Sequence, residues 1–169
     1  MAHLKDTTWQ TQRGLTLVEL MVTIAVIAIL ATTAVSTMSN MRAKQQVIAA
    51  AEEILSKAQR AKSLARKKSE DFQITFDNDA NVGVLTVSGS DYTEDLNLAQ
   101  MHSNVSVLAN QSSFTFDYVR ATAGPSGSIS VTSKSMPSEY MAKITISGQG
   151  RVRICSDSSL LSSRYESCS

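Results

Sequence analysis

The stretch that says most about the fold is Gly14-Leu15-Thr16-Leu17-Val18-Glu19-Leu20, which directly follows Arg13. Glu19 is the only charged residue in the apolar run of 21 residues from position 15 to position 35. A lone carboxylate is costly in an apolar environment unless it has a partner. A new amino terminus, made by cutting the chain between Gly14 and Leu15, would supply that partner. The stretch therefore predicts a hydrophobic segment that serves assembly.

The apolar run is long enough to cross a bilayer of ~30 Å at ~1.5 Å per residue. It exceeds the core of a secretory signal peptide, and no A-x-A cleavage site stands directly behind it. The polar leader, residues 1–14, carries Lys5 and Arg13 against Asp6. Because basic flanks stay in the cytoplasm, we expect one membrane span with its N-terminus inside. A single-span anchored protein with an accidental Glu19 is the alternative.

Residues 14–20 resemble the class III signal of type IV pilins and type II secretion pseudopilins. The resemblance covers about the first 40 residues. It implies that a prepilin peptidase cuts after Gly14 and methylates the amino group of Leu15. It also implies that Glu19 pairs with the N-terminal amine of a neighbouring subunit. Leu15 departs from the phenylalanine that usually begins the mature chain.

The same resemblance implies where the protein resides and what it meets. Its partners would be other major and minor pilins, the prepilin peptidase and the inner membrane. Before assembly it would be a single-pass inner-membrane protein with a periplasmic head. Afterwards it would be a subunit of a pilus or pseudopilus filament. Because Glu19 is retained, the extreme tip position is not expected, since tip subunits of this family lack that carboxylate.

A long helix is predicted after the leader, because residues 15–73 contain neither Gly nor Pro and are rich in helix formers. Some 50 helical residues would extend ~75–80 Å. Ser36 stands where major pilins often carry a proline, so no proline kink is expected. The second half has an amphipathic pattern. Its apolar positions are Val47, Ile48, Ala51, Ile54, Leu55, Ala58 and Leu64.

From Phe72 the hydrophobic period changes from 3.6 to 2, which predicts short strands. They are expected at 72–76, 82–87, 105–107, 114–116, 129–131 and 144–146. Residues 89–104 have the weakest pattern and are expected to form a loop. The fold class is therefore α+β and type IV pilin-like, a long helix packed on an antiparallel head of one or two small sheets. The expected divisions are the leader 1–14, the membrane or filament-core helix 15–38, the amphipathic half 39–70 and the head 71–169.

The two cysteines, Cys155 and Cys168, both lie near the C-terminus. In an oxidising periplasm they are expected to form one disulfide, which would contribute ~3 kcal/mol. Two isolated thiols are the alternative. A metal site is not expected, because the chain has no Cys-x-x-Cys and no histidine near either cysteine.

Catalysis has little support in the sequence. His102 is a lone imidazole and is expected at the surface, and no motif places a base beside the many serines. No phosphate-binding glycine loop is present, and no cofactor is expected. We therefore interpret the chain as a non-enzyme that is itself a peptidase substrate at Gly14-Leu15. Without the leader it has 14 basic and 14 acidic side chains, so its net charge does not predict a nucleic-acid partner.

A second informative stretch is Gly148-Gln149-Gly150-Arg151-Val152-Arg153-Ile154-Cys155. If 150–155 is a strand, Arg151 and Arg153 share one face and lie ~6–7 Å apart. Two guanidiniums at that spacing suit adjacent phosphates of a nucleic-acid backbone. Lys143 and Arg164 are possible extensions of this basic strip. The alternative is an exposed strand face with ordinary solubilising arginines.

Gly150-Arg151-Val152-Arg153 is similar to the Gly-Arg-x-Arg signature of the GspH/FimT family of minor pilins, which is linked to DNA uptake in natural transformation. The resemblance implies that Gly150, Arg151 and Arg153 form a DNA-binding site. Such backbone contacts would be independent of sequence and sensitive to salt. A rival basic cluster precedes the head, but cations near the C-terminus of a helix complement its dipole and keep the exposed face soluble, which explains the cluster without a ligand. Its members are Arg60, Lys62, Arg66, Lys67 and Lys68.

The sequence thus predicts a minor pilin of a type IV pilus that helps to prime assembly and presents a DNA-binding head. The alternative is a structural minor pilin, or a type II secretion system pseudopilin H, without DNA binding. The shared N-terminal motif does not separate the pilus from the secretion machinery.

Overall fold

The computed structural model of the chain describes residues 16–77 and 83–168. It divides into two compact units, Met1–Ser39 and Asn40–Ser169, which are described separately below. The leader, the predicted cleavage site Gly14-Leu15 and residue 82 of one predicted strand lie outside the described residues.

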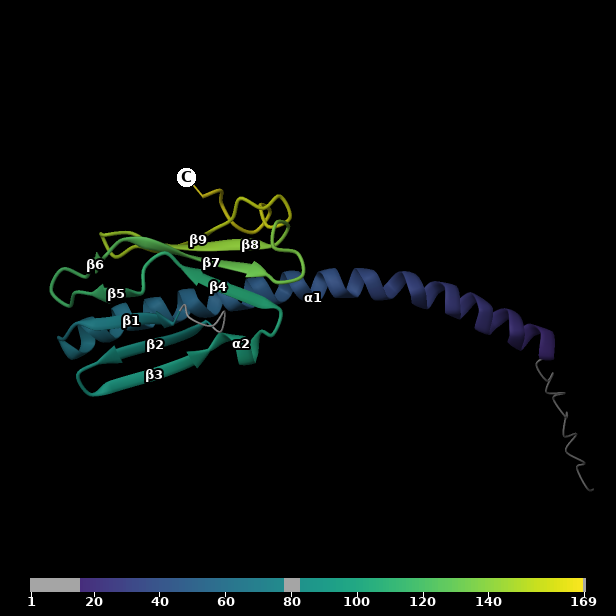
Figure 1. Ribbon diagram of the computed structural model, residues 1–169, viewed down its shortest axis with the longest axis horizontal. Coiled ribbons are helices and arrows are strands. Elements are labelled where there is room, and N and C mark those ends of the chain that lie inside the picture. Colours follow the sequence, from purple (N-terminus) through teal and green to yellow (C-terminus); the bar gives the residue numbers. More distant parts are fainter. Residues whose placement is uncertain (1–15, 78–82, 169) are drawn as a thin grey trace, which may run out of the picture. The chain divides into compact units, whose positions relative to one another are not determined.

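Helix α1 runs from Leu17 to Lys68, contributes to both units and contains no glycine or proline (Figure 1). It ends with Ser69 in the left-handed region at φ 54°, and the Glu70 N–H donates to the Ala65 carbonyl at 3.3 Å. This is the hydrogen-bond pattern of a Schellman cap with serine in the usual glycine position. The predicted long helix is therefore present, and its end is locally specified.

In the first unit α1 exposes a nearly continuous set of apolar side chains. They include Leu17, Val18, Leu20, Met21, Val22, Ile24, Val26, Ile27, Ile29 and Leu30, each at least half exposed. Among the described residues, no helix combines the length and apolarity needed to cross a membrane. The membrane span expected over residues 15–38 therefore stays a prediction.

The second unit holds two antiparallel sheets. The first has five strands in the order β3-β2-β1-β5-β6. Their bounds are β1 Phe72–Asp77, β2 Val84–Gly89, β3 Tyr92–Asn97, β5 Ser113–Phe116 and β6 Ala123–Gly124. The second has four strands in the order β4-β7-β8-β9, with bounds β4 Val105–Ala109, β7 Gly127–Ser133, β8 Met141–Ile146 and β9 Val152–Cys155. A short helix, α2, spans Leu98–Met101.

One hydrophobic core joins the second half of α1 to both sheets. The helix contributes Val47 and Ile54 together with a row of buried alanines, and the sheets contribute Phe72, Phe114 and Phe116. Small alanine side chains let the helix approach the sheets closely, and the larger sheet residues fill the remaining space. The alternation of buried and half-buried residues along β1, β7 and β8 agrees with the period of 2 in the sequence.

The expected α+β architecture is confirmed, but the stretch 89–104 is not a loop. It forms β3 and α2. Strand β3 escaped detection because Glu94, an acidic residue, occupies an inward position between Tyr92 and Leu96. Its carboxylate forms an ion pair with Lys57 of α1, so the charge is satisfied without an apolar side chain. The two-residue strand β6 is too short to produce a pattern.

Candidate functional site

The β8–β9 turn, Ser147–Gly150, positions the predicted Gly-Arg-x-Arg segment. The Gly150 N–H donates to the Ser147 carbonyl at 2.8 Å, and the Ser147 N–H donates to the Arg151 carbonyl at 3.0 Å. The Arg151 N–H donates to Ser147 Oγ at 3.1 Å. These three bonds fix the backbone at the point where Arg151 begins.

Gly150 is required by packing as well as by conformation. Its φ of +72° lies in the left-handed region, which residues with a Cβ rarely adopt. A Cβ built on Gly150 would lie 2.0 Å from the Ala121 carbonyl oxygen. Ala121 itself has φ 53°, and the neighbouring Ala123 N–H donates to the Gly148 carbonyl at 3.1 Å. The turn is therefore pressed against the β5–β6 loop, backbone to backbone.

Arg151 and Arg153 are both exposed, and the intervening Val152 is half-buried against the core. Strand β9 begins at Val152, so Arg151 stands just before it. Arg153 lies opposite Thr145 of β8. Within residues 16–77 and 83–168, neither guanidinium has a hydrogen-bond or ion-pair partner. Both arginines are exposed, but the strand expected over 150–155 begins only at Val152, so a strand face shared by Arg151 and Arg153 stays a prediction.

The two possible extensions of the basic strip differ. Lys143 lies opposite Cys155 and is therefore a diagonal neighbour of Arg153 on the same sheet face. Arg164 instead donates from Nη2 to Glu52 Oε1 of α1 at 2.6 Å. The hydrogen bond to Glu52 is the main cause that raises the pKa of Arg164 above its ordinary value. The hydrogen bond with Tyr165 is the second cause. Its charge is engaged within the chain, which disfavours the idea that Arg164 extends the strip.

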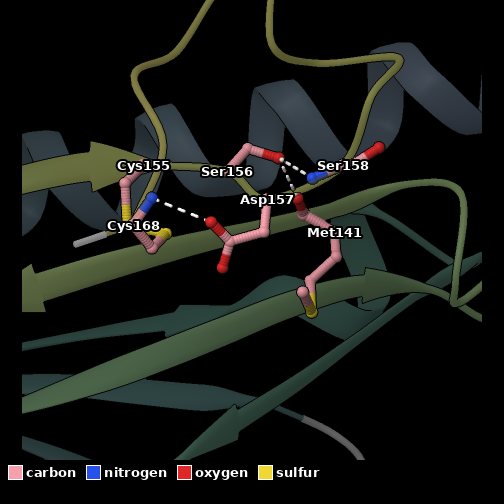
Figure 2. The surroundings of a disulfide bond; sticks show 6 residues. All are labelled: Met141, Cys155, Ser156, Asp157, Ser158 and Cys168. Atoms are coloured by element: carbon pink, nitrogen blue, oxygen red, sulfur yellow. Dashed lines mark hydrogen bonds between the residues drawn. A yellow bond between two sulfur atoms is a disulfide. The ribbon is translucent and has the colours of Figure 1, made fainter.

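The predicted disulfide between Cys155 and Cys168 is present. Figure 2 shows the loop that it closes: the Cys168 N–H donates to Asp157 Oδ1 at 2.9 Å, and Ser156 Oγ donates to the Met141 carbonyl at 2.5 Å. Leu161 is fully buried in the core. The C-terminal loop is thus fixed beside β8 and β9 rather than free.

The rival basic cluster does not act as one patch. Lys57 and Arg60 face Glu94 of β3, with Arg60 Nη1 at 3.8 Å from the carboxylate. The hydrogen bond from Lys57 is the main cause that lowers the pKa of Glu94, and the hydrogen bond from Tyr92 is the second cause. The same bond between Tyr92 and Glu94 raises the pKa of Tyr92. Arg60 therefore has a structural contact that its place in the sequence did not reveal.

The other members of that cluster are divided between structure and solvent. Lys68 lies 4.0 Å from Glu70 and over the rings of Phe72 and Tyr92. Lys62 Nζ donates to the Gly150 carbonyl at 2.8 Å. Arg66 and Lys67 are exposed and have no partner among the described residues.

His102, which was expected to be a surface side chain, is only partly exposed. Its side chain is 14% exposed, and Nε2 lies 3.3 Å from Glu53 Oε2 of α1. It connects the end of α2 to the long helix. No group of three or more potential metal ligands occurs in the described parts of the chain.

At the start of α1, Thr16 Oγ1 accepts the Glu19 N–H at 3.2 Å. Thr16 and Glu19 have the spacing of a capping box, in which a hydroxyl satisfies the free N–H three residues later. Glu19 is exposed, and its carboxylate has no ion-pair partner within residues 16–77 and 83–168. The sequence contained this T-x-x-E signal, but its capping role was not predicted.

Comparison with known proteins gives one sequence match and several structural ones. Residues 9–35 match the prokaryotic N-terminal methylation motif. No curated protein matches the chain. A crystal structure of the type IV minor pilin FimU from Pseudomonas aeruginosa PAO1 is similar at 18% identity and a TM-score of 0.53, over 66% of this chain and 89% of FimU.

The minor pseudopilin EpsH from the type 2 secretion system of Vibrio cholerae is similar at 12% identity and a TM-score of 0.53. The match covers 66% of this chain and 97% of EpsH. At these identities the likeness establishes the fold. A prepilin-type N-terminus and the fold of minor pilins and pseudopilins therefore occur together in this chain.

Proposed function

We propose that this protein, a type IV pilin-like minor pilin or pseudopilin, is a minor pilin that helps to prime a type IV pilus and contacts DNA through its head. The observation that carries the DNA contact is the pair Arg151 and Arg153, exposed together without a carboxylate partner among the described residues. The likeness to FimU, a type IV minor pilin, supports the filament role.

Assembly would begin at the N-terminus. A prepilin peptidase would cut between Gly14 and Leu15 and methylate the new amino group, and the apolar segment would hold the subunit in the inner membrane. Glu19 would then pair with the N-terminal amine of a neighbouring subunit. The absence of an internal partner for Glu19 among the described residues supports this role, because a carboxylate in an apolar filament core needs a counter-charge.

This assembly role is tested by Glu19→Ala. The variant should be cut and methylated normally, because the peptidase acts at Gly14-Leu15, but it should not enter filaments. Processing is read from the mass of the mature chain, and incorporation from sheared filaments probed for the subunit. Incorporation at the wild-type level would remove the charge-pairing argument.

The DNA contact is supported by the geometry of the turn. Three hydrogen bonds and the close contact of Gly150 with Ala121 fix the backbone that carries Arg151. A site held in place before binding loses less entropy on complex formation. Guanidiniums bind phosphate oxygens in a bidentate manner, and two of them on one face would follow a nucleic-acid backbone without reading its bases.

A second candidate is a structural minor pilin or a type II secretion pseudopilin H that meets only protein neighbours. The likeness to EpsH, a minor pseudopilin of a secretion system, supports it at the same TM-score as FimU. The two candidates share the anchor and the fold. They differ in whether the free arginine pair meets a polyanion.

Duplex DNA binding by the full-length chain separates them. The protein is purified in non-ionic detergent with its disulfide intact, and affinity is measured by mobility shift over a series of salt concentrations. Wild type should bind in low salt, and Arg151→Ala/Arg153→Ala should lose the shift without a change in melting temperature. Arg42→Ala/Lys44→Ala, which removes the same charge from the helix, is the control and should still bind. If wild type shows no salt-dependent binding, the structural candidate stands.

A further inference from the structure

We infer that the polyanion site is larger than the arginine pair and continues around the Ser147–Gly150 turn onto α1 and the β5–β6 loop, where Lys62, Arg66 and Arg120 complete it. We call these three residues the rim cations. The inference rests on the proposed DNA contact and extends it to residues outside the Gly-Arg-x-Arg segment. The sequence presented the α1 cations and the arginine pair as separate, rival patches.

The contact that joins the patches is the hydrogen bond from Lys62 Nζ to the Gly150 carbonyl at 2.8 Å. Gly150 directly precedes Arg151, so a helix cation and the first arginine of the pair meet at one peptide unit. A lysine that donates to a carbonyl keeps its positive charge, because the carbonyl does not neutralise it. Lys62 therefore adds a fixed cation beside Arg151 while also supporting the turn.

Arg66 extends this surface along the helix. It lies four residues after Lys62, which is ~6 Å further along the same helix face. Its side chain is exposed and free of partners within the described residues. An open hollow of about 360 Å³ lies on this part of α1 and is lined by Gln59, Lys62, Ser63, Arg66 and Lys67.

Arg120 lies on the β5–β6 loop, one residue before the segment that packs against Gly150. The following residue, Ala121, is the one whose carbonyl oxygen would meet a Cβ on Gly150. Arg120 is exposed, and its guanidinium has no partner in the part of the chain that the structure describes. Neither carboxylate near this loop pairs with the Arg120 guanidinium in the described structure: Asp117 Oδ1 accepts the Arg120 backbone N–H, and Asp71 Oδ1 accepts the Tyr118 N–H.

A ligand that uses this surface must carry several negative charges at intervals, because the cations come from three elements around one turn. The phosphate backbone of DNA meets that requirement. Each neutralised phosphate contributes about 0.9 to the slope of log affinity against log salt concentration. The salt dependence of binding therefore reports how many phosphates the site neutralises, independently of the affinity at any one salt concentration.

The test compares Arg66→Gln/Arg120→Gln with Arg42→Gln/Lys44→Gln in the full-length chain. Both variants lose two positive charges, but Arg42 lies 24 residues before Arg66 on α1, about 36 Å along the helix. We expect the rim variant to bind duplex DNA about tenfold more weakly in low salt, with the salt slope reduced by about 2. The control variant should keep the wild-type slope. Lys62 is left unchanged because its replacement would also disturb the turn.

If the rim and control variants bind alike while Arg151→Ala/Arg153→Ala fails to bind, the arginine pair stands alone and the inference is wrong. If wild type does not bind DNA at all, the proposed function fails and the extended site fails with it. A rim variant with a lowered salt slope and an unchanged melting temperature supports the inference.

Discussion

The two halves of the C-terminal region, residues 150–155 and residues 156–168, use arginine in different ways. Arg151 and Arg153 end in solvent, whereas Arg164 donates to Glu52 on α1 and lies beside Tyr165. The first half keeps its charges free on a fixed backbone. The second half uses its charge to fasten a loop. The comparison shows that a basic residue becomes a candidate ligand contact only after its partners within the chain are known.

The most severe way to break the first half is Gly150→Ala. The new Cβ would lie 2.0 Å from the Ala121 carbonyl oxygen, at a backbone conformation that alanine rarely adopts. Backbone strain and steric overlap together should cost about 4 kcal/mol. We expect a clearly lower melting temperature and, because the turn must move, weaker DNA binding as well. Gly148→Ala is the matched control, since its nearest neighbour is a carbonyl oxygen at 3.9 Å. Equal stability of the two variants would contradict the close contact at Gly150.

The second half is tested by removing the disulfide with Cys155→Ser/Cys168→Ser. The bond links residues 13 apart, and the chain-entropy estimate for such a loop is about 3 kcal/mol. Chemical unfolding should show this loss, and reduction of the wild-type protein should reproduce it. DNA binding at temperatures where the variant is folded should change little, because the turn that positions Arg151 has its own hydrogen bonds. Loss of binding in the folded variant would show that the loop positions the arginine pair.

Local patterns were sufficient for much of this molecule. The absence of glycine and proline predicted α1, and the period of 2 predicted strands such as 72–76 and 144–146. The disulfide also followed from the sequence, because only two cysteines are present. In each case the information lies in residues that are neighbours along the chain.

The contacts that join distant segments were not predictable in this way. Lys62 and Gly150 are 88 positions apart in the sequence, and Lys57 and Glu94 are 37 positions apart. Both pairings depend on where the β8–β9 turn and strand β3 lie against α1, and therefore on strand order and register. A single sequence reveals neither. For the same reason, Arg60 and Arg66 looked equivalent in the sequence although only Arg66 is free among the described residues.

The smallest expected effect comes from the arginine that is already paired. Arg164→Gln removes one positive charge from the second half, as Arg153→Gln does from the first. If partners decide function, Arg153→Gln should weaken DNA binding and lower the salt slope by about 1, whereas Arg164→Gln should leave both at wild-type values. Arg164→Gln should instead lower the melting temperature slightly, because an exposed ion pair contributes little to stability. Mobility shifts and thermal unfolding of the two variants, side by side, measure both quantities. Equal losses of affinity would mean that net charge alone governs binding. The pairing of Arg164 with Glu52 would then make no difference to DNA binding.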